Sequence, residues 1–421
     1  MNKIITSQTQ NILFMSCVFI IPLLVSGPFL SDLLVSLISL FFLYFSIKNK
    51  LHSFYKNFYF YGFVLFYFLS ILSSLLSDDL LLSLKSSLFY IRIGLFSIFI
   101  FYIISYDKKI LDYFYYVFLI TFFVIILDGY YQYFSGQNII GYKLVYFEGN
   151  LSRVSSFFGD ELILGSYLSR LFPLLFALFI IREKKYSFEI YFISILFISI
   201  DVLIYLSGER TAFFYLNLST LFIIFFIKKY QKLRLVTFLF EIILIGIISL
   251  NNNDLKNRML SDPFKDMGLV KDSDKQNIFT PMHDSHIKTA FKMFLDKPIL
   301  GHGPKLFRIK CSDPKYAVGN WPCSTHPHNF YIQLLAETGI IGFSFLFIAL
   351  IFVGYSSLKQ LKSILFKEKR YLNDYQVCLL AGILISVWPF SPNGNFFNNW
   401  LSIIYSLPIG FYLHSIYEKD I

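Results

Sequence analysis

Charged residues are scarce in this chain. Asp, Glu, Lys and Arg make up only 15% of its 421 residues, whereas hydrophobic residues make up 56%, with 52 Phe and 30 Tyr among them. So few charged groups could not cover the surface of a soluble protein of this size. We therefore interpret the chain as an all-α integral membrane protein.

Long apolar runs account for most of the chain. Each has about 20 residues, enough for a helix to cross a ~30 Å hydrocarbon layer. We predict twelve spans, at residues 11–27, 29–47, 58–77, 86–105, 110–134, 162–181, 188–206, 212–227, 233–250, 329–356, 375–391 and 396–416. The pairs that flank Gly27-Pro28 and Ser207–Thr211 are the hardest to separate. The first run lacks a cleavage-site pattern, so we expect a retained span rather than a signal peptide.

Basic residues are concentrated in alternate connections between these runs. The basic connections are residues 48–56, 108–109, 182–185, 228–234 and 359–370. Because basic loops stay on the cytoplasmic side, we place these loops and both termini there. The formal net charge of +10 comes largely from them, which removes the case for a nucleic-acid partner.

One long polar segment interrupts the apolar runs. We divide the chain into helices at residues 1–250, a periplasmic loop domain at 251–325, and final helices at 326–421. Residues 284–295 of the loop have helical spacing, and a Pro- and Gly-containing turn follows at 298–304. Cys311 and Cys323 lie in this loop on the oxidising side, which predicts a disulfide bond, with two free thiols as the alternative.

Arginines recur near the outer face. They are Arg92, Arg153, Arg170 and Arg210. Their guanidinium groups match phosphate oxygens and stay charged, so they are candidates for binding a polyanionic headgroup. Arg210 lies in the turn at Ser207–Thr211, where small residues would let a bulky headgroup approach.

Structural ion pairs are the alternative role for two of these arginines. Arg92 and Arg170 could pair with intramembrane acids and simply stabilise helix packing. The candidate acids are Glu161, Asp128 and Asp201. Glu241 has no partner that the sequence identifies.

The segment His326-Pro327-His328-Asn329 precedes a helical run and supports three hypotheses. The first is a metal site that also uses His283, Asp284, His286 and His302, although no ligand pair of fixed spacing completes the set. The second is a helix cap, with Gly339 and Gly342 allowing close packing. The third is a general base, because the positive end of a helix dipole would keep His328 neutral.

Two motifs resemble a known family. His328-Asn329, nine residues, and then Gly339-Ile340-Ile341-Gly342 resemble the signature of the bacterial O-antigen ligase and O-antigen polymerase superfamily. The turn at Ser207-Gly208-Glu209-Arg210 and the turn at 298–303 also resemble motifs of that family. The family has many spans and a long periplasmic loop directly before the signature.

The resemblance implies a GT-C-like membrane glycosyltransferase of the bacterial inner membrane that needs no metal or other cofactor. Its donor would be a glycan on undecaprenyl pyrophosphate, used at the periplasmic face. The acceptor is the lipid A core in a ligase and another carrier-linked glycan in a polymerase, where a chain-length regulator is a further possible partner. Phe343 after the signature, and Phe158-Gly159-Asp160-Glu161, favour the polymerase.

The resemblance also implies roles for individual residues. His328 would remove a proton from the acceptor hydroxyl, with inversion at the sugar carbon. Arg210, Arg153, Arg170 and Arg92 would bind the donor pyrophosphate. Glu161 and Asn329 would orient the acceptor or His328.

A transporter or flippase of lipid-linked saccharide is the rival hypothesis. Carriers place their sites near the membrane midplane, between halves related by a repeat. The chain shows no internal repeat, and its candidate groups gather at one face. A path lined by Asp201 and Glu241 would favour transport.

The topology makes a direct prediction. Reporter fusions after Lys367 and after Asp272 should fall on opposite sides of the membrane, because a basic connection holds the first and the long loop the second. Fusions on the same side would show that the topology is wrong.

Overall fold

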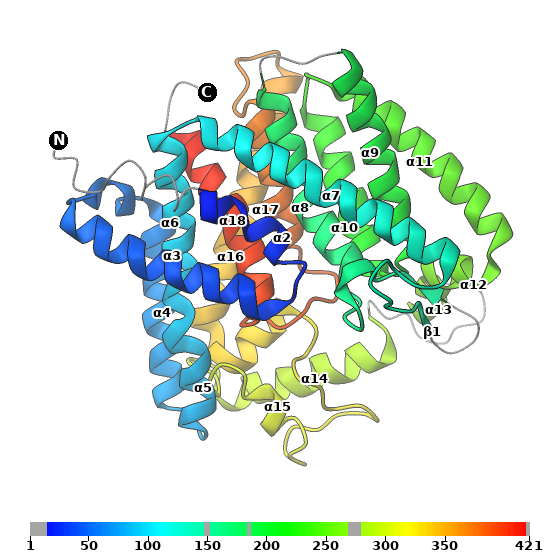
Figure 1. The fold of residues 1–421 in the computed structure, drawn as a ribbon. Coiled ribbons are helices and arrows are strands. Elements are labelled where there is room, and N and C mark those ends of the chain that lie inside the picture. Colours follow the sequence, from blue (N-terminus) through cyan, green and yellow to red (C-terminus); the bar gives the residue numbers. More distant parts are fainter. Residues whose placement is uncertain (1–14, 147–151, 183–186, 268–278, 418–421) are drawn as a thin grey trace.

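The computed structural model describes residues 15–146, 152–182, 187–267 and 279–417 as a helical bundle with one short ribbon (Figure 1). The long helices are α3 Pro28–Lys48, α4 Phe58–Leu75, α6 Ile91–Tyr106, α7 Lys109–Ser135, α8 Leu164–Ile181, α9 Ser187–Leu206, α10 Arg210–Phe226, α11 Gln231–Asn251, α14 Pro281–Asp296, α16 Phe330–Leu365, α17 Asp374–Ser386 and α18 Asn399–Tyr417. The short elements are α2 Ile20–Leu23, η1 His52–Tyr55, α5 Leu80–Ser87, η2 Leu88–Tyr90, η3 Ser156–Phe158, α12 Asn253–Lys256, η4 Asn257–Ser261, α13 Asp262–Asp266 and α15 Phe307–Lys310. Strands β1 Val145–Tyr146 and β2 Ser152–Arg153 pair antiparallel.

The predicted all-α membrane fold is confirmed. Eight helical stretches of the described residues are long and apolar enough to cross a membrane, namely α3, α4, Leu80–Tyr106, α7, α8, α9, α11 and α16. Helices α10 and α17 are apolar but shorter. The predicted spans from 29–47 onward each coincide with a helix. The first, 11–27, lies partly outside the described residues, so the count of twelve stays a prediction.

Glycine separates the two pairs of helices that the sequence left uncertain. Gly27 has a φ of 107° and precedes Pro28, the first residue of α3. Gly208 has a φ of 66° in the turn between α9 and α10. Glycine adopts such angles without the penalty that a Cβ imposes, so the chain turns at both points.

The basic connections meet at one end of the bundle. The Asp374 carboxylate accepts hydrogen bonds from the backbone N–H groups of Lys228 (3.0 Å) and Lys229 (2.7 Å). The Lys229 ammonium donates to the carbonyl of Ile180 (3.2 Å), and Arg370 donates to that of Phe226 (2.8 Å). Three connections far apart in sequence therefore lie together, as alternate loops of a membrane bundle should. That this end is cytoplasmic stays a prediction.

Helix α16 is broken at Gly339, and the turn at 298–303 packs into the break. Gly339 has a φ of 67° and a ψ of −169°, and a Cβ there would lie 2.2 Å from the carbonyl oxygen of Ile299. Ile340 N–H donates to Pro298 O (2.8 Å), and Gly303 N–H donates to Glu337 O (2.8 Å). The first glycine of the signature therefore allows contact with the turn, rather than with a neighbouring helix as the close-packing hypothesis supposed.

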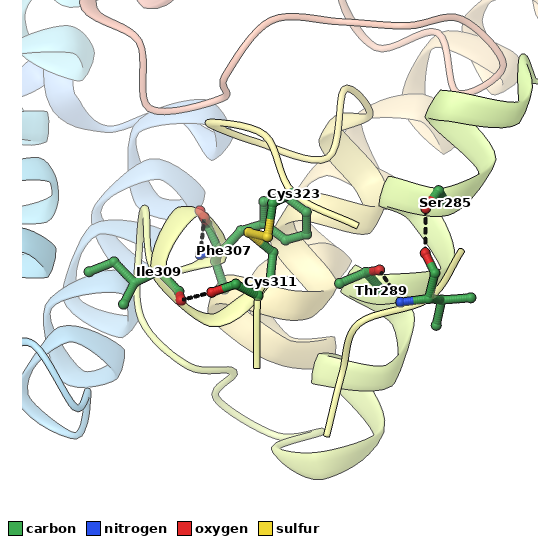
Figure 2. The surroundings of a disulfide bond; sticks show 9 residues. Ser285, Thr289, Phe307, Ile309, Cys311 and Cys323 are labelled. Carbon is green, nitrogen blue, oxygen red and sulfur yellow. Dashed lines mark hydrogen bonds between the residues drawn. A yellow bond between two sulfur atoms is a disulfide. The ribbon is translucent and has the colours of Figure 1, made fainter. Parts of the chain in front are cut away.

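The loop domain is held together by α14 and a disulfide bond. Cys311 and Cys323 are bonded, with their Cα atoms 5.1 Å apart (Figure 2). Ser285 and Thr289 of α14 bind the backbone of Val318, inside the segment that the disulfide closes. The chain therefore enters the histidine segment from a fixed position.

An ion pair lies in the apolar interior of helices α9 to α11. Arg234 Nη1 lies 2.6 Å from Asp201 Oδ2, and both side chains are fully buried. Thr220 accepts from Arg234 Nη2 (2.6 Å), and Glu241 lies beside Asp201. Asp201 therefore pairs with Arg234, and it is also the neighbour that the sequence did not identify for Glu241.

We expect unreduced, denatured protein to take up two thiol labels and reduced protein four, because Cys17 and Cys378 are unpaired. Cys311→Ser should lower stability by about 2–4 kcal/mol through the lost loop constraint, measured as a lower midpoint of thermal unfolding. Cys378→Ser is the control without a disulfide. Four labels without reductant would contradict the bond.

Candidate functional site

Four histidine rings meet where the histidine segment crosses α14. The ring centroid of His328 lies 4.1 Å from that of His326, 5.1 Å from His283 and 5.4 Å from His286. His283 and His286 are three residues apart, so both lie on one face of α14. The sequence placed these four residues in one region, but their contact depends on how α14 packs.

His328 lies outside α16 in a strained conformation. Its φ is 56°, a value that is uncommon outside glycine, although asparagine, aspartate and histidine adopt it more often than other residues. Its Nε2 lies 3.1 Å from Ser324 Oγ, and its carbonyl accepts a hydrogen bond from Asn393 N–H (2.8 Å). The contact with Ser324 therefore orients the ring, and the hydrogen bond from Asn393 holds the backbone that carries it.

Asn329 caps α16. Its Oδ1 accepts from the N–H groups of Tyr331 (3.0 Å) and Ile332 (3.2 Å), and its Nδ2 donates to Pro389 O (2.7 Å). The cap hypothesis is therefore right for Asn329 but wrong for His328. These bonds fix the amide at the helix start, and its predicted role in orienting the acceptor or His328 stays a prediction.

The histidines are held neutral. Burial, followed by the neighbouring His326, His283 and His286, lowers the pKa of His328 to about 3. Burial likewise lowers the pKa of His326 to about 4. We had expected the helix dipole to keep His328 neutral, whereas removal from water and mutual repulsion do so.

The metal hypothesis gains no support from this cluster. Within the described ranges, no group of three or more His, Cys, Asp or Glu side chains is arranged to hold a metal ion. His326 Nε2 donates to Asn393 O (3.1 Å), and its Nδ1 lies 2.9 Å from Thr325 Oγ1. Both nitrogens of that ring are therefore engaged within the protein.

Asn393 joins the histidine segment to Arg170. Its backbone binds His326 and His328, while its Oδ1 accepts from Arg170 Nη2 (3.3 Å) and from the Tyr215 hydroxyl (2.6 Å). Asn393 is 5% exposed, so these bonds form away from bulk water. Our sequence interpretation missed this residue, and the only local signal was the turn-forming Ser391-Pro392-Asn393-Gly394.

Arg170 is a buried cation that forms no ion pair with a carboxylate among the described residues, although Glu209 lies close enough for Arg170 to lower its pKa. Its guanidinium lies over the rings of Tyr215 (4.6 Å) and Tyr405 (5.1 Å), and its Nε donates to Ser166 Oγ (3.1 Å). Among the described residues, Nη1 has no hydrogen-bond acceptor. The structural alternative, in which Arg170 pairs with Glu161, Asp128 or Asp201, is therefore wrong, because the described contacts of the cation are to tyrosine rings, Ser166 and Asn393.

Three further arginines surround the turn at Gly208. Arg153 Nε donates to Ser207 O (2.8 Å), and Arg258 Nε donates to Gly208 O (2.9 Å). Arg210 Nε donates to Arg258 O (2.7 Å). A Cβ on Gly208 would lie 3.2 Å from Arg153, so the glycine admits arginine side chains where we had expected it to admit a headgroup. We call Arg153, Arg210 and Arg258, with this turn, the arginine turn.

Acidic groups balance part of this charge. Arg210 pairs with Asp262 (3.3 Å) and Asp266 (3.0 Å). Glu209 accepts from the N–H groups of Gly165 (2.6 Å) and Ser166 (3.0 Å) at the start of α8. Burial raises the pKa of Glu209 to about 7, although nearby Arg153 opposes the shift. A phosphate bound to Arg210 would therefore compete with carboxylates.

Two predicted site residues lie elsewhere. Arg92 Nη2 pairs with Asp32 Oδ1 at 2.6 Å. The structural alternative for Arg92 was therefore correct in kind but named the wrong acids. Glu161 is exposed, and no described contact joins it to His328. Asp128, another acid we proposed as a partner, accepts from Ser156 Oγ (2.5 Å).

The site thus combines neutral histidines with several guanidinium groups. The arginine turn and Arg170 provide positive charge, and Asn393 links Arg170 to the segment of His328. A neutral imidazole can accept a proton, and guanidinium groups can stabilise a leaving diphosphate. Arg258, which the sequence interpretation also missed, has no local motif, because it reaches the turn from a separate helix.

Comparison with known proteins is consistent with this geometry. Residues 192–347 match a protein-family model described as O-Antigen ligase. That range contains the arginine at 210, the turn at 298–303 and the whole signature at 328–342, so the resemblance to the O-antigen ligase and polymerase superfamily is confirmed. No curated protein matches the chain.

The histidine cluster predicts acid lability. The pKa values of His283, His286, His326 and His328 are all lowered by burial, so below the unfolded value of about 6.5 the unfolded chain binds more protons. Stability from these groups is complete above about pH 7 and is lost as the pH falls. Glu209, whose pKa is raised by burial, acts in the opposite direction.

The midpoint of thermal unfolding should therefore fall between pH 7.5 and pH 5, and the fall should be smaller in His286→Gln. His52→Gln, at an exposed position, is the control. An equal fall in all three proteins would contradict the electrostatic description of the cluster.

Proposed function

Given the O-antigen ligase match at residues 192–347, we propose that the protein transfers a glycan from undecaprenyl pyrophosphate to an acceptor hydroxyl at the periplasmic face of the bacterial inner membrane. The membrane helices and the family match support this class of activity. The donor, the inner membrane and the face belong to the proposal.

One observation carries the proposal. Asn393 contacts both halves of the site, since its backbone binds His326 and His328 while its side chain binds Arg170. A proton acceptor is thereby linked, through one residue, to a buried cation that forms no ion pair among the described residues. Hydroxyl attack on a sugar diphosphate needs both groups close together.

The mechanism follows from the charges. Arg170 and the arginine turn bind the donor pyrophosphate, whose charge raises the pKa of nearby His328 from its low value. The acceptor oxygen attacks the anomeric carbon and gives its proton to His328. The carbon–oxygen bond to the carrier breaks, and its electron pair leaves on the pyrophosphate. Attack opposite the leaving group gives inversion, and the guanidinium groups take the role that Mg²⁺ has elsewhere.

Polymerase and ligase forms of this reaction differ only in the acceptor. Phe343 after the signature favours a carrier-linked glycan over the lipid A core. A regulator of chain length would be a partner of the polymerase form. Long glycan lost from cells, with single repeats left on lipid A, would indicate a polymerase, and unattached carrier-linked chains a ligase.

Transport has less support. Asp201 and Glu241, which would have to line a path, lie beside each other and beside Arg234 in a buried group. The other candidate groups lie at the end of the bundle that holds α14, away from the basic connections. This arrangement favours a surface enzyme.

His328→Asn tests the proposed base. Asparagine tolerates positive φ, so the backbone at this position should be retained while the proton acceptor is lost. We expect glycan chain formation to fall on the order of 10² to 10⁴-fold at matched membrane levels.

His52→Asn provides the same substitution at an exposed position and should have no effect. Binding of the undecaprenyl pyrophosphate donor should persist in His328→Asn, since the arginines remain. Normal glycan from that variant would end the general-base proposal.

A further inference from the structure

A second group of cations adjoins the histidine segment, and the mechanism above does not use it. Lys305 lies in the turn before α15, and Arg308 lies within α15. Arg308 is close enough to His326 to contribute to its lowered pKa. Arg308, a cation of the loop, therefore lies beside the segment that carries the proposed base, and the Cys311–Cys323 disulfide joins the end of α15 to the chain just before that segment.

This group is separate from the arginine turn. Lys297 and Lys310, which flank it in sequence, both reach Asp78 between α4 and α5. A Cβ on Gly303 would likewise meet Ser77 and Ser83 of the same region. Figure 1 shows α15 near α5 and apart from α13, whose Asp262 and Asp266 pair with Arg210 of the arginine turn. The two groups thus pack against different helices.

Lys305 and Arg308 differ from their basic neighbours Lys297 and Lys310, which are ion-paired. Within the described residues, neither side chain has a hydrogen-bond or ion-pair partner, and Arg308 is exposed. Glu337 is a carboxylate that interacts electrostatically with both of them. Its oxygens already accept from Phe307 N–H (3.2 Å) and Gln333 Nε2 (2.9 Å), so both cations remain available.

The backbone is strained at Lys305. Its φ is 64°, in the left-handed region that residues with a Cβ seldom adopt. The strain persists because the flanking Gly303 and Phe307 are held by hydrogen bonds to Glu337. Unrelieved strain at a partnerless cation is typical of a position kept for a ligand.

We propose that Lys305 and Arg308 bind a phosphate group carried by the acceptor, which rests on the glycosyl transfer proposed above. The acceptor hydroxyl must reach His328 from a different direction than the donor pyrophosphate. Its own lipid lies in the same membrane, so its phosphate lies near the same interface. That phosphate belongs to an undecaprenyl pyrophosphate carrier in a polymerase and to lipid A in a ligase, and both present the same anion to the two cations.

The test is lipid binding by the full chain in phosphatidylcholine vesicles that contain either undecaprenyl pyrophosphate or lipid A. We compare wild type with Lys305→Gln/Arg308→Gln. For a ligase, lipid A should bind the double variant about tenfold more weakly or worse, as expected for lost charge-assisted bonds, with undecaprenyl pyrophosphate unchanged. For a polymerase, two undecaprenyl pyrophosphate molecules per chain should fall to one.

Lys288→Gln/Lys315→Gln is the matched control, because it removes two charges from the same domain at residues that pair with Asp284 and Asp296. It should bind both lipids as wild type does. If Lys305→Gln/Arg308→Gln also binds both lipids as wild type does, this acceptor site is wrong while the proposed function stands. If wild type binds neither lipid, the proposed function itself fails.

Discussion

The structure depends on the hydrogen bonds made by the backbone N–H and C=O groups at the break in α16. Gly339 turns the chain out of helical geometry, which would leave carbonyl and N–H groups unpaired at the end of a membrane helix. The turn at 298–303 replaces the missing bonds, since His302 N–H donates to Ala336 O (3.0 Å) and Ile340 N–H donates to Pro298 O. Ser73 of α4 also donates to Leu300 O (2.6 Å). The loop domain is thereby attached to the bundle.

Several features of the site follow from this attachment. With the turn fixed, α14 lies against the first part of α16 and brings His283 and His286 to His328. The disulfide then limits where the chain can enter the histidine segment. Lys305 follows the same turn and interacts electrostatically with Glu337 of α16. A motif that looks like helix packing in the sequence thus acts by docking a loop.

Charged residues serve two purposes in this molecule, and their surroundings distinguish them. Arg92 and Arg234 each pair with an aspartate inside the bundle, so their charge is neutralised where it lies. Such ion pairs orient helices, but their opposite charges largely cancel, so they attract a charged ligand only weakly. Arg170 is instead surrounded by tyrosines and an asparagine, so its charge persists. A predicted position near the outer face therefore does not tell a structural arginine such as Arg92 from a candidate binding residue such as Arg170.

The sequence by itself determined what depends on local composition and spacing. Apolar runs located the helices, glycine located the turn before Arg210, and the signature located His328, because each is a property of neighbouring residues. Tertiary structure alone decided which distant residues meet. Asn393 reaches His328 across 65 positions, and the partners of Arg92 and Asp201 were misassigned for the same reason. Helix packing sets such contacts. It results from many weak van der Waals interactions between distant residues, so no local sequence pattern indicates which residues will meet.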